Sequence, residues 1–281
     1  MERTWEIDVR GLPTFTDALQ KFERESGIQL RGIDCAMAFA GAVAGEQLSL
    51  ARSRWTITRA GITAVFGKEV DIINTIAARA WAVKSGTGDV ETIRGVGSPN
   101  LGRAGRYAMV LVDQGVGAAI IDVDRDGSVK ILETEAGHTD FPATSEQELK
   151  LANALKGTRQ QASWEQMLKA EVQAPEFAQT YGGLSEAERL RIPARTLGRF
   201  CVNLMHVYGA WHGIMITGGR GGKILQSGER FAFDAAFKER SRFSRLVEAC
   251  PVWKVEQRNA VLQGAAECLA HKFNPSIRHA A

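Results

Sequence analysis

The sequence predicts an α/β protein with two compact lobes. Runs of strand length alternate with runs of helical periodicity, which is the order that builds helices onto a sheet. A nearly all-apolar run at 33–40 has the length of a strand covered on both faces, and 69–74 is expected to be another buried strand. The 281 residues also exceed what one hydrophobic core usually serves. We expect a small lobe over 1–85, joined by a C-terminal helix at 261–281, and a large lobe over 86–260.

The composition is that of an ordinary folded protein. Hydrophobic residues make up 44% and charged residues 24%, and the formal net charge of +3 is too small to favour nucleic acid or an anionic membrane surface. Residues 1–6 have no apolar segment behind a basic start, so we expect no signal peptide. The uncharged run 200–219 contains two histidines and an asparagine, which favours a buried helix and strand over a membrane span. We expect a soluble, cytoplasmic protein.

The cysteine and histidine spacing predicts no metal site. His206 and His212 would face different sides of a helix, and the sequence has no Cys-x-x-Cys pair. Wide spacing is typical of reduced core thiols, and it holds for all four cysteines: Cys35, Cys201, Cys250 and Cys268.

In the small lobe, the helix expected at 13–27 has the clearest ends, with Thr14 as its N-cap and Gly27 as its stop. Asn74 and Thr75 follow the last strand, at the edge where open α/β sheets bind ligands. Strands are expected at 4–9, 33–40, 47–58 (one or two antiparallel strands) and 69–74, and further helices at 59–67 and 76–83.

The large lobe is expected to follow a junction at 84–105, which is rich in Gly, Ser and Asn. Asp124-Arg125-Asp126-Gly127 predicts a hairpin, because an Asp-Gly pair suits a tight turn between strands. Strands are expected at 107–112, 116–123, 128–132, 213–217 and 251–255, and helices at 145–155, 164–172, 195–208, 231–237 and 261–269.

Two glycine-containing turns are candidates for binding phosphate. Gly115 and Gly117 lie in the turn 113–117, where the missing side chains let backbone N–H groups approach an anion. Gly218 and Gly219 open a segment that follows a buried strand, although this segment is not a Walker loop. An ordinary hairpin at the first position and a plain flexible turn at the second remain the alternatives.

The densest polar cluster lies at 133–141. Glu133, Glu135, His138 and Asp140 surround an Ala-Gly pair that is too small to form a core and too flexible to favour a helix. A polar turn after a strand is where a sheet protein presents side chains to a ligand. A solvated turn without function is the alternative.

Several segments, collinear from about residue 4 to residue 270, resemble the bacterial ATP-dependent glucokinase family. The resemblance implies an actin-like, ribonuclease H-like ATPase fold of the hexokinase type, with two α/β lobes. The most specific segment is Glu135-Ala136-Gly137-His138-Thr139-Asp140-Phe141. The others are Ile72-Ile73-Asn74, Trp55 after the Gly45 turn, Gly115-Val116-Gly117, the run from Gly213 to Gly219, Phe237 to Phe243, and Leu262-Gln263-Gly264-Ala265-Ala266.

The resemblance implies that Asn74, Glu135 and His138 bind the hydroxyl groups of a hexose, with glucose as the expected sugar. This role suits their chemistry, because a carboxylate accepts hydrogen bonds from two neighbouring hydroxyls and an imidazole can donate or accept one. The resemblance also implies that the glycine turns at 115–117 and 218–219 are the places for the phosphates of ATP.

The sequence departs from the family pattern where phosphate is handled. Thr75 stands where the family has the Asp that takes the proton from the sugar hydroxyl, and a threonine hydroxyl is not basic near neutral pH. Asp113 replaces the first glycine of the Gly-Thr-Gly turn, and Ala51-Arg52 replace a Thr-Asn pair. We find no counterpart of the family's opening strand and Asp-x-Gly-Gly-Thr-Asn phosphate loop, nor of its second sugar-binding Glu in 156–163.

Three hypotheses follow. The first is a degenerate hexose-binding pseudokinase with no intact catalytic group, no metal site and no certain cofactor. The second is an active ATP-dependent glucokinase that uses ATP and Mg²⁺. The third is a protein-interaction module on a glucokinase scaffold. The shortened first sheet would leave an open edge, and family members are often dimers, so we also expect a homodimer.

Overall fold

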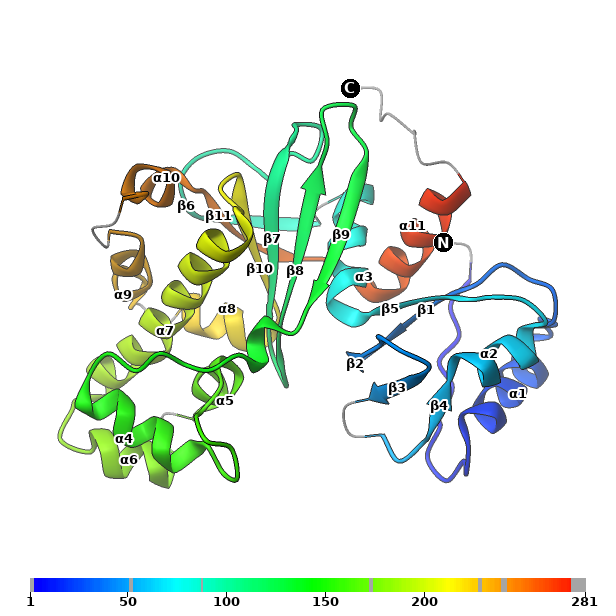
Figure 1. The fold of residues 1–281 in the computed structure, drawn as a ribbon, viewed down its shortest axis with the longest axis horizontal. Coiled ribbons are helices and arrows are strands. Elements are labelled where there is room, and N and C mark those ends of the chain that lie inside the picture. The colour runs from blue at the N-terminus through cyan, green and yellow to red at the C-terminus, as the bar shows by residue number, and fades with distance from the viewer. Residues whose placement is uncertain are drawn as a thin grey trace. The chain divides into compact units, whose positions relative to one another are not determined.

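The computed structural model describes residues 3–50, 53–86, 88–171, 174–226, 229–238 and 242–273. The chain forms two compact units (Figure 1). Unit 1 contains the residues up to Ser85 and the segment that begins at Asn259, and unit 2 contains Gly86–Arg258. The chain therefore leaves unit 1 once and returns to it after unit 2 is complete.

Unit 1 contains two small sheets and the helices around them. β1 and β5 are parallel neighbours, whereas β2, β3 and β4 form an antiparallel sheet. The strands are β1 (Ala36–Phe39), β2 (Gly41–Ala42), β3 (Gln47–Leu50), β4 (Ile57–Thr58) and β5 (Asp71–Asn74). The helices are α1 (Phe15–Ser26), α2 (Arg59–Phe66), α3 (Thr75–Ala82), α11 (Ala260–Phe273) and the short 3-10 helix η1 (Val83–Ser85).

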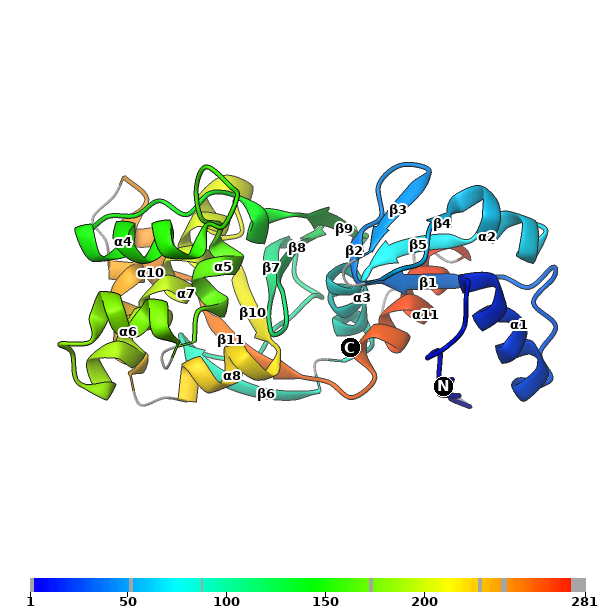
Figure 2. The same cartoon turned by 90° about the horizontal axis from the view of Figure 1, so that it is seen from below.

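The last helix, α11, is fastened to α3 and β5 within unit 1. Figures 1 and 2 both show α11 beside α3. Gly264 allows the close approach, because a Cβ there would lie 1.6 Å from the carbonyl oxygen of Ala78. Lys272 donates to both carboxylate oxygens of Asp71 at 3.1 Å. The C-terminal segment thus completes the helical layer over β1 and β5.

Two expectations for unit 1 need correction. The expected strand at 4–9 is absent, and Trp5 instead packs edge-to-face on Phe22 of α1 with ring centroids 5.9 Å apart. The segment is held by a side chain rather than by a strand ladder. β1 is half-buried along its whole length rather than covered on both faces. The ends of α1 are confirmed, with Thr14 as N-cap and Gly27 in the left-handed conformation at φ 71°.

Unit 2 is built on one six-stranded sheet with the order β6-β11-β10-β7-β8-β9. β10 runs parallel to β7 and β11, while β8 is antiparallel to β7 and β9, and β6 is antiparallel to β11. The strands are β6 (Asp89–Arg94), β7 (Gly105–Val112), β8 (Val116–Val123), β9 (Val129–Thr134), β10 (Gly213–Thr217) and β11 (Val252–Glu256).

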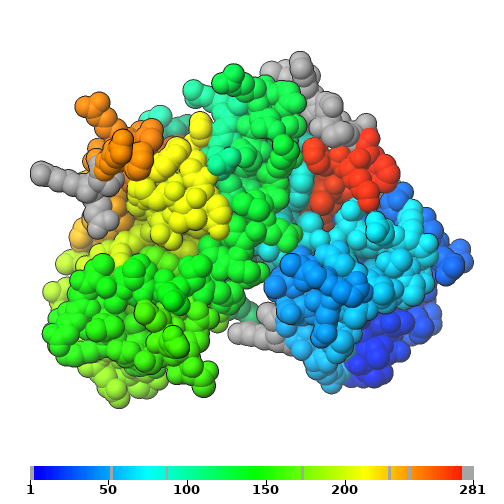
Figure 3. All heavy atoms as spheres, viewed as in Figure 1, coloured from blue at the N-terminus to red at the C-terminus, as the bar shows by residue number. Residues whose placement is uncertain are grey.

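The helices of unit 2 enclose one large apolar core, in which α7 is the longest element and Leu197, Phe200 and Leu204 are fully buried. α4 and α6 pack against each other (Figure 2), and Figure 3 draws this part of the unit as green and yellow-green spheres. The helices are η2 (Ala136–His138), α4 (Glu146–Leu155), α5 (Trp164–Lys169), α6 (Pro175–Tyr181), α7 (Glu186–Tyr208), α8 (Gly219–Gln226), α9 (Arg230–Ala235), η3 (Ala236–Lys238) and α10 (Ser244–Ala249).

Unit 2 also differs from expectation in four places. β6 lies inside the junction expected at 84–105, and α6 was not expected at all. α7 begins before Pro193 rather than after it, and the plain turn suggested at 218–223 is the start of α8. The hairpin closed by Asp124-Arg125-Asp126-Gly127 is confirmed by the pairing of β8 with β9. Ala51-Arg52 and parts of three expected segments (172, 239–241 and 274–281) lie outside the described residues.

None of the helices in the described ranges combines the length and apolar character that a membrane crossing requires.

Candidate functional site

The polar cluster follows β9 in unit 2 and forms the 3-10 turn η2. Glu135 precedes the turn, and His138 ends it. Gly137 is required between them, because a Cβ there would lie 1.9 Å from the carbonyl oxygen of Val116. The turn therefore lies directly against the start of β8, and its backbone can follow this path only with glycine at its centre.

The structure brings Glu135 and His138 together. The Nε2 atom of His138 lies 3.8 Å from Oε2 of Glu135, and each side chain is about half exposed, at 51% and 53%. Both polar ends are therefore accessible from solvent, and they form a compact pair of acceptor and donor. A carboxylate that accepts and an imidazole that donates or accepts can both form hydrogen bonds with a ligand's hydroxyl groups.

The residues next to this pair are held by hydrogen bonds to the segment that precedes α5 (Trp164–Lys169). Arg159 donates through Nη2 to the carbonyl oxygen of His138 at 2.9 Å and to Oδ1 of Asp140 at 3.4 Å. The backbone N–H of Phe141 donates to the carbonyl oxygen of Ala162 at 2.8 Å. The backbone of the turn is thus anchored at His138 and Phe141.

A buried ion cluster supports the end of the same segment. Arg199 donates to the carbonyl oxygen of Pro142 at 2.5 Å, and its guanidinium lies over the Phe141 ring at 5.1 Å. Glu148, which is only 1% exposed, accepts hydrogen bonds at 3.0 Å from both Arg195 and Arg199. Burial alone would raise the pKa of Glu148, but hydrogen bonds from Thr144 and the two guanidinium groups hold that pKa below its ordinary value.

Glu165 on α5 is a second carboxylate near the turn that the sequence did not single out. Its Oε2 accepts a hydrogen bond from the N–H of Val116 at 2.9 Å, and Val116 is also the residue that Gly137 packs against. The capping box of Ser163 and Gln166 marks the start of α5 in the sequence, and Glu165 lies in the first turn of that helix. Glu165 lies two residues beyond the segment 156–163, which contains no carboxylate.

The two glycine turns lie together in unit 2. β7 and β10 are parallel neighbours, so the turn after β7, which contains Gly115, and the turn after β10 lie at the same edge of the sheet. Gly117, which was expected in the first turn, lies instead within β8, opposite Leu111 of β7. Gly218 has φ 100°, and a Cβ on it would lie 2.5 Å from the carbonyl oxygen of Val112. A Cβ on Gly219 would lie 3.9 Å from Oδ1 of Asp113. Close backbone approach is possible here, but a carboxylate faces the second turn.

Asn74 and Thr75 lie in unit 1, at the junction of β5 and α3. Asn74 is 5% exposed, and its Oδ1 caps α3 by accepting from the N–H of Ala77 at 2.8 Å. Thr75 is half-buried as the first residue of the helix. Asn74 therefore has at least a structural role, and Thr75 occupies the position at which the start of a helix would favour a negative charge.

Within the described residues, no group of three or more His, Cys, Asp or Glu side chains is arranged to hold a metal ion. The glycine edge of unit 2 allows a nucleotide's phosphates to approach the backbone closely, and in this respect the site fits ATP. The N–H groups of Asp113 and Val116, however, already donate to the carbonyl oxygen of Gly115 and to Glu165. Asp113 opposes that fit, because its carboxylate would lie near phosphate oxygens that carry the same charge.

Comparison with known proteins decides the family. The family model described as Glucokinase matches residues 2–171 and 177–272. The chain belongs to the glucokinase family. It is 26% identical to the glucokinase of Xylella fastidiosa strain 9a5c and 27% identical to that of Stenotrophomonas maltophilia strain R551-3, each alignment covering 93% of this chain and 84% of the relative.

Solved glucokinase structures share the fold. A glucokinase from an Antarctic psychrotroph aligns with a TM-score of 0.67 at 23% identity, over 92% of this chain and 86% of that one. The glucokinase of Balamuthia mandrillaris, solved in complex with glucose, aligns with a TM-score of 0.68 at 14% identity, over 92% and 82%. The expected actin-like, hexokinase-type fold is therefore confirmed.

Proposed function

We propose that this member of the glucokinase family binds a hexose but transfers phosphate from ATP poorly or not at all. The observation that carries the proposal is Thr75. It begins α3 directly after Asn74, where the resemblance to the family calls for the Asp that takes the proton from the sugar hydroxyl. Loss of a general base costs roughly 10²–10⁴-fold in rate.

The hexose-binding half of the proposal rests on Glu135, His138 and Asn74. The half-exposed carboxylate and imidazole lie within 3.8 Å of each other on an anchored turn. Glu165 adds a second carboxylate beside the same turn, through its bond to Val116. Glucose is the proposed ligand, because the family resemblance assigns these positions to glucose hydroxyls.

The second candidate function is an active ATP-dependent glucokinase that uses ATP and Mg²⁺. The observation in its favour is that the glycine turns at 115–117 and 218–219 lie at one edge of the sheet, where backbone N–H groups could hold phosphates. In that case a carboxylate other than residue 75 would have to act as the base.

A coupled assay for glucose 6-phosphate separates the two candidates. We expect the wild-type protein to turn over at least 10²-fold below the usual range of about 1–10³ s⁻¹. Thr75→Asp alone should leave the rate low, because Asp113 still faces the phosphates. Thr75→Asp combined with Asp113→Gly should be the fastest of the three. Wild-type turnover within the usual range would establish the active enzyme instead.

We further propose a homodimer in a reducing, cytoplasmic compartment. β1 and β5 pair only with each other among the described strands, so each has an edge that a second chain could cover. All four cysteines are free. Burial raises the pKa of Cys35 to about 11 and that of Cys250 to about 12, which keeps these thiols protonated and unreactive.

A further inference from the structure

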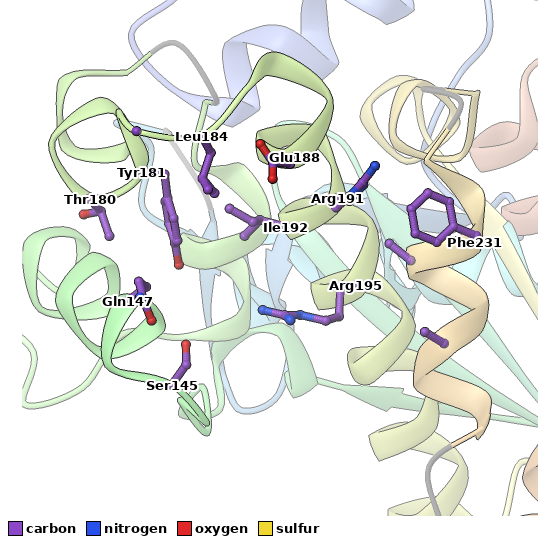
Figure 4. A pocket seen from close by; sticks show the side chains of 13 residues that line it. Ser145, Gln147, Thr180, Tyr181, Leu184, Glu188, Arg191, Ile192, Arg195 and Phe231 are labelled. Carbon is purple, nitrogen blue, oxygen red and sulfur yellow. The ribbon is translucent and has the colours of Figure 1, made fainter.

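Unit 2 contains a cavity of about 620 Å³ between α4, α6, α7 and α9 (Figure 4). None of its lining residues belongs to the polar turn at 133–141 or to the glycine turns. Its volume lies within the range of cavities that hold small molecules in proteins. The proposed hexose-binding and phosphate-binding roles therefore do not account for it.

One part of the cavity wall is apolar. Leu184, Ile192 and Phe231 line it, together with two alanines of α9. The Phe231 ring is 56% exposed although it is large and apolar. The Arg191 guanidinium lies over this ring, 4.9 Å from its centroid. An apolar body placed in the cavity would cover the ring and remove it from water.

Another part of the cavity wall is positively charged. Arg191 and Arg195, on successive turns of α7, line it (Figure 4). Arg191 donates through Nε to Glu229 at 2.7 Å, and Arg195 donates through Nη2 to Glu148 at 3.0 Å. Among the described residues, the other guanidinium nitrogens of both arginines have no acceptor. These planar groups therefore retain N–H donors that suit a carboxylate.

The acidic residue of the lining does not cancel this preference. Glu188 is used locally, since its Oε2 accepts from the N–H and the hydroxyl of Ser185 at 2.9 and 2.7 Å. Hydrogen bonds from Ser185 and, after them, the positive charge of Arg191 hold the pKa of Glu188 below its ordinary value, so this carboxylate stays negative and neutralises part of the positive charge. Both arginines nevertheless keep N–H donors that no described residue accepts from.

Tyr181 supplies an independent sign of an absent polar partner. It lines the cavity and is only 6% exposed, and its buried hydroxyl has no hydrogen-bond partner among the described residues. An unpaired buried hydroxyl is costly, and a polar group of a ligand would remove that cost.

We propose that this cavity is a second ligand site, which binds a small amphipathic carboxylate. The carboxylate lies against Arg191 and Arg195, and the apolar body lies against Leu184, Ile192 and Phe231. A free sugar fits this lining poorly, because it would leave the apolar wall without an apolar partner. A polyphosphate would bring more negative charge than two partly neutralised arginines can balance.

Titration calorimetry of the whole protein with 2-naphthoate tests this site. We expect saturable binding of one molecule per chain. The neutral analogue 2-naphthamide should bind at least about tenfold more weakly, because a charge-assisted hydrogen bond is worth more than a neutral one. Absence of saturable binding, or equal affinity for the acid and the amide, would overturn the proposal.

Variants locate the bound molecule. Ala235→Trp fills the cavity from an exposed position on α9 and should reduce 2-naphthoate affinity at least about tenfold. Arg191→Gln should do the same while keeping the apolar walls. Lys150→Gln removes one positive charge from an exposed residue of α4 outside the cavity, and it should leave the affinity unchanged. Unchanged affinity in Ala235→Trp would place the ligand elsewhere and refute the assignment.

Discussion

At the scale of single residues, the proposed hexose binding rests on Glu135 and His138, whose side chains are both about half exposed. The sequence pattern predicted that Glu135 and His138 belong together, because only Ala136 and Gly137 separate them, and the structure places their polar atoms 3.8 Å apart. The pattern did not predict Glu165, because its proximity depends on how α5 packs against the start of β8. It also did not predict that Asn74 caps a helix with its amide oxygen.

Glu135→Ala should weaken glucose binding by at least about tenfold, since it removes a carboxylate that accepts from two hydroxyl groups. The fold should be preserved, because the side chain is about half exposed. Glucose titration of the purified variant measures the change. Glu146→Ala removes an exposed carboxylate of α4 elsewhere in unit 2, and it serves as the matched control. Equal affinity in both variants would mean that the polar cluster is only a turn.

At the scale of elements, helices with capping residues next to them in the sequence could be predicted. Elements whose formation depends on contacts with distant parts of the chain could not. The run Gly219-Arg220-Gly221-Gly222 looks like a flexible turn. In the folded protein these glycines let α8 approach the sheet, since a Cβ on Gly221 would lie 3.1 Å from Ile216 and a Cβ on Gly222 would lie 3.1 Å from Lys254. The requirement for glycine is thus steric, and nothing in the local sequence reveals it.

α7 and β6 give one example of each kind: the start of α7 has a local sequence signal, and β6 has none. A helix was expected only over 195–208, whereas α7 begins at Glu186 and includes Pro193. The capping box of Ser185 and Glu188 marks the true start, and this signal is local. β6 could not be predicted locally, because its ladder is formed with β11, which lies far along the chain.

The ion cluster between α4 and α7 gives a pH prediction. The pKa of Glu148 is lowered in the folded protein, so its contribution to stability is complete above the unfolded pKa of about 4.3 and is lost as pH falls through the folded value. Glu148→Gln should lower the free energy of unfolding at pH 7 by about 3–5 kcal/mol, because two buried or half-buried arginines lose their partner.

Urea denaturation at a series of pH values measures this effect. The Glu148→Gln variant should lose less stability than the wild type between neutral pH and pH 3, because it no longer carries the group that titrates. Glu146→Gln on the exposed face of the same helix should behave like the wild type. A Glu148→Gln variant with unchanged stability and unchanged acid sensitivity would show that the cluster does not stabilise unit 2.

At the scale of the whole molecule, the collinear motifs of the sequence predicted both the fold class and the family. The match of a glucokinase family model to nearly the whole chain and the structural likeness to solved glucokinases confirm both. The alternation of strands and helices alone would have given only an α/β protein. The specific order of short motifs carried the rest. Some of them lie at strand ends or turns, such as Ile72-Ile73-Asn74 at the end of β5 and Gly137 in η2, whereas Leu262-Gln263-Gly264-Ala265-Ala266 lies within α11.

We propose above that the protein binds a hexose but transfers phosphate from ATP poorly or not at all. Calorimetry with glucose titrated into the protein in the presence of ATP and Mg²⁺ tests both halves in one experiment, because binding gives a saturable heat and turnover gives sustained thermal power. We expect a saturable isotherm with no sustained power. Sustained power proportional to protein concentration, or no saturable heat at all, would contradict the claim.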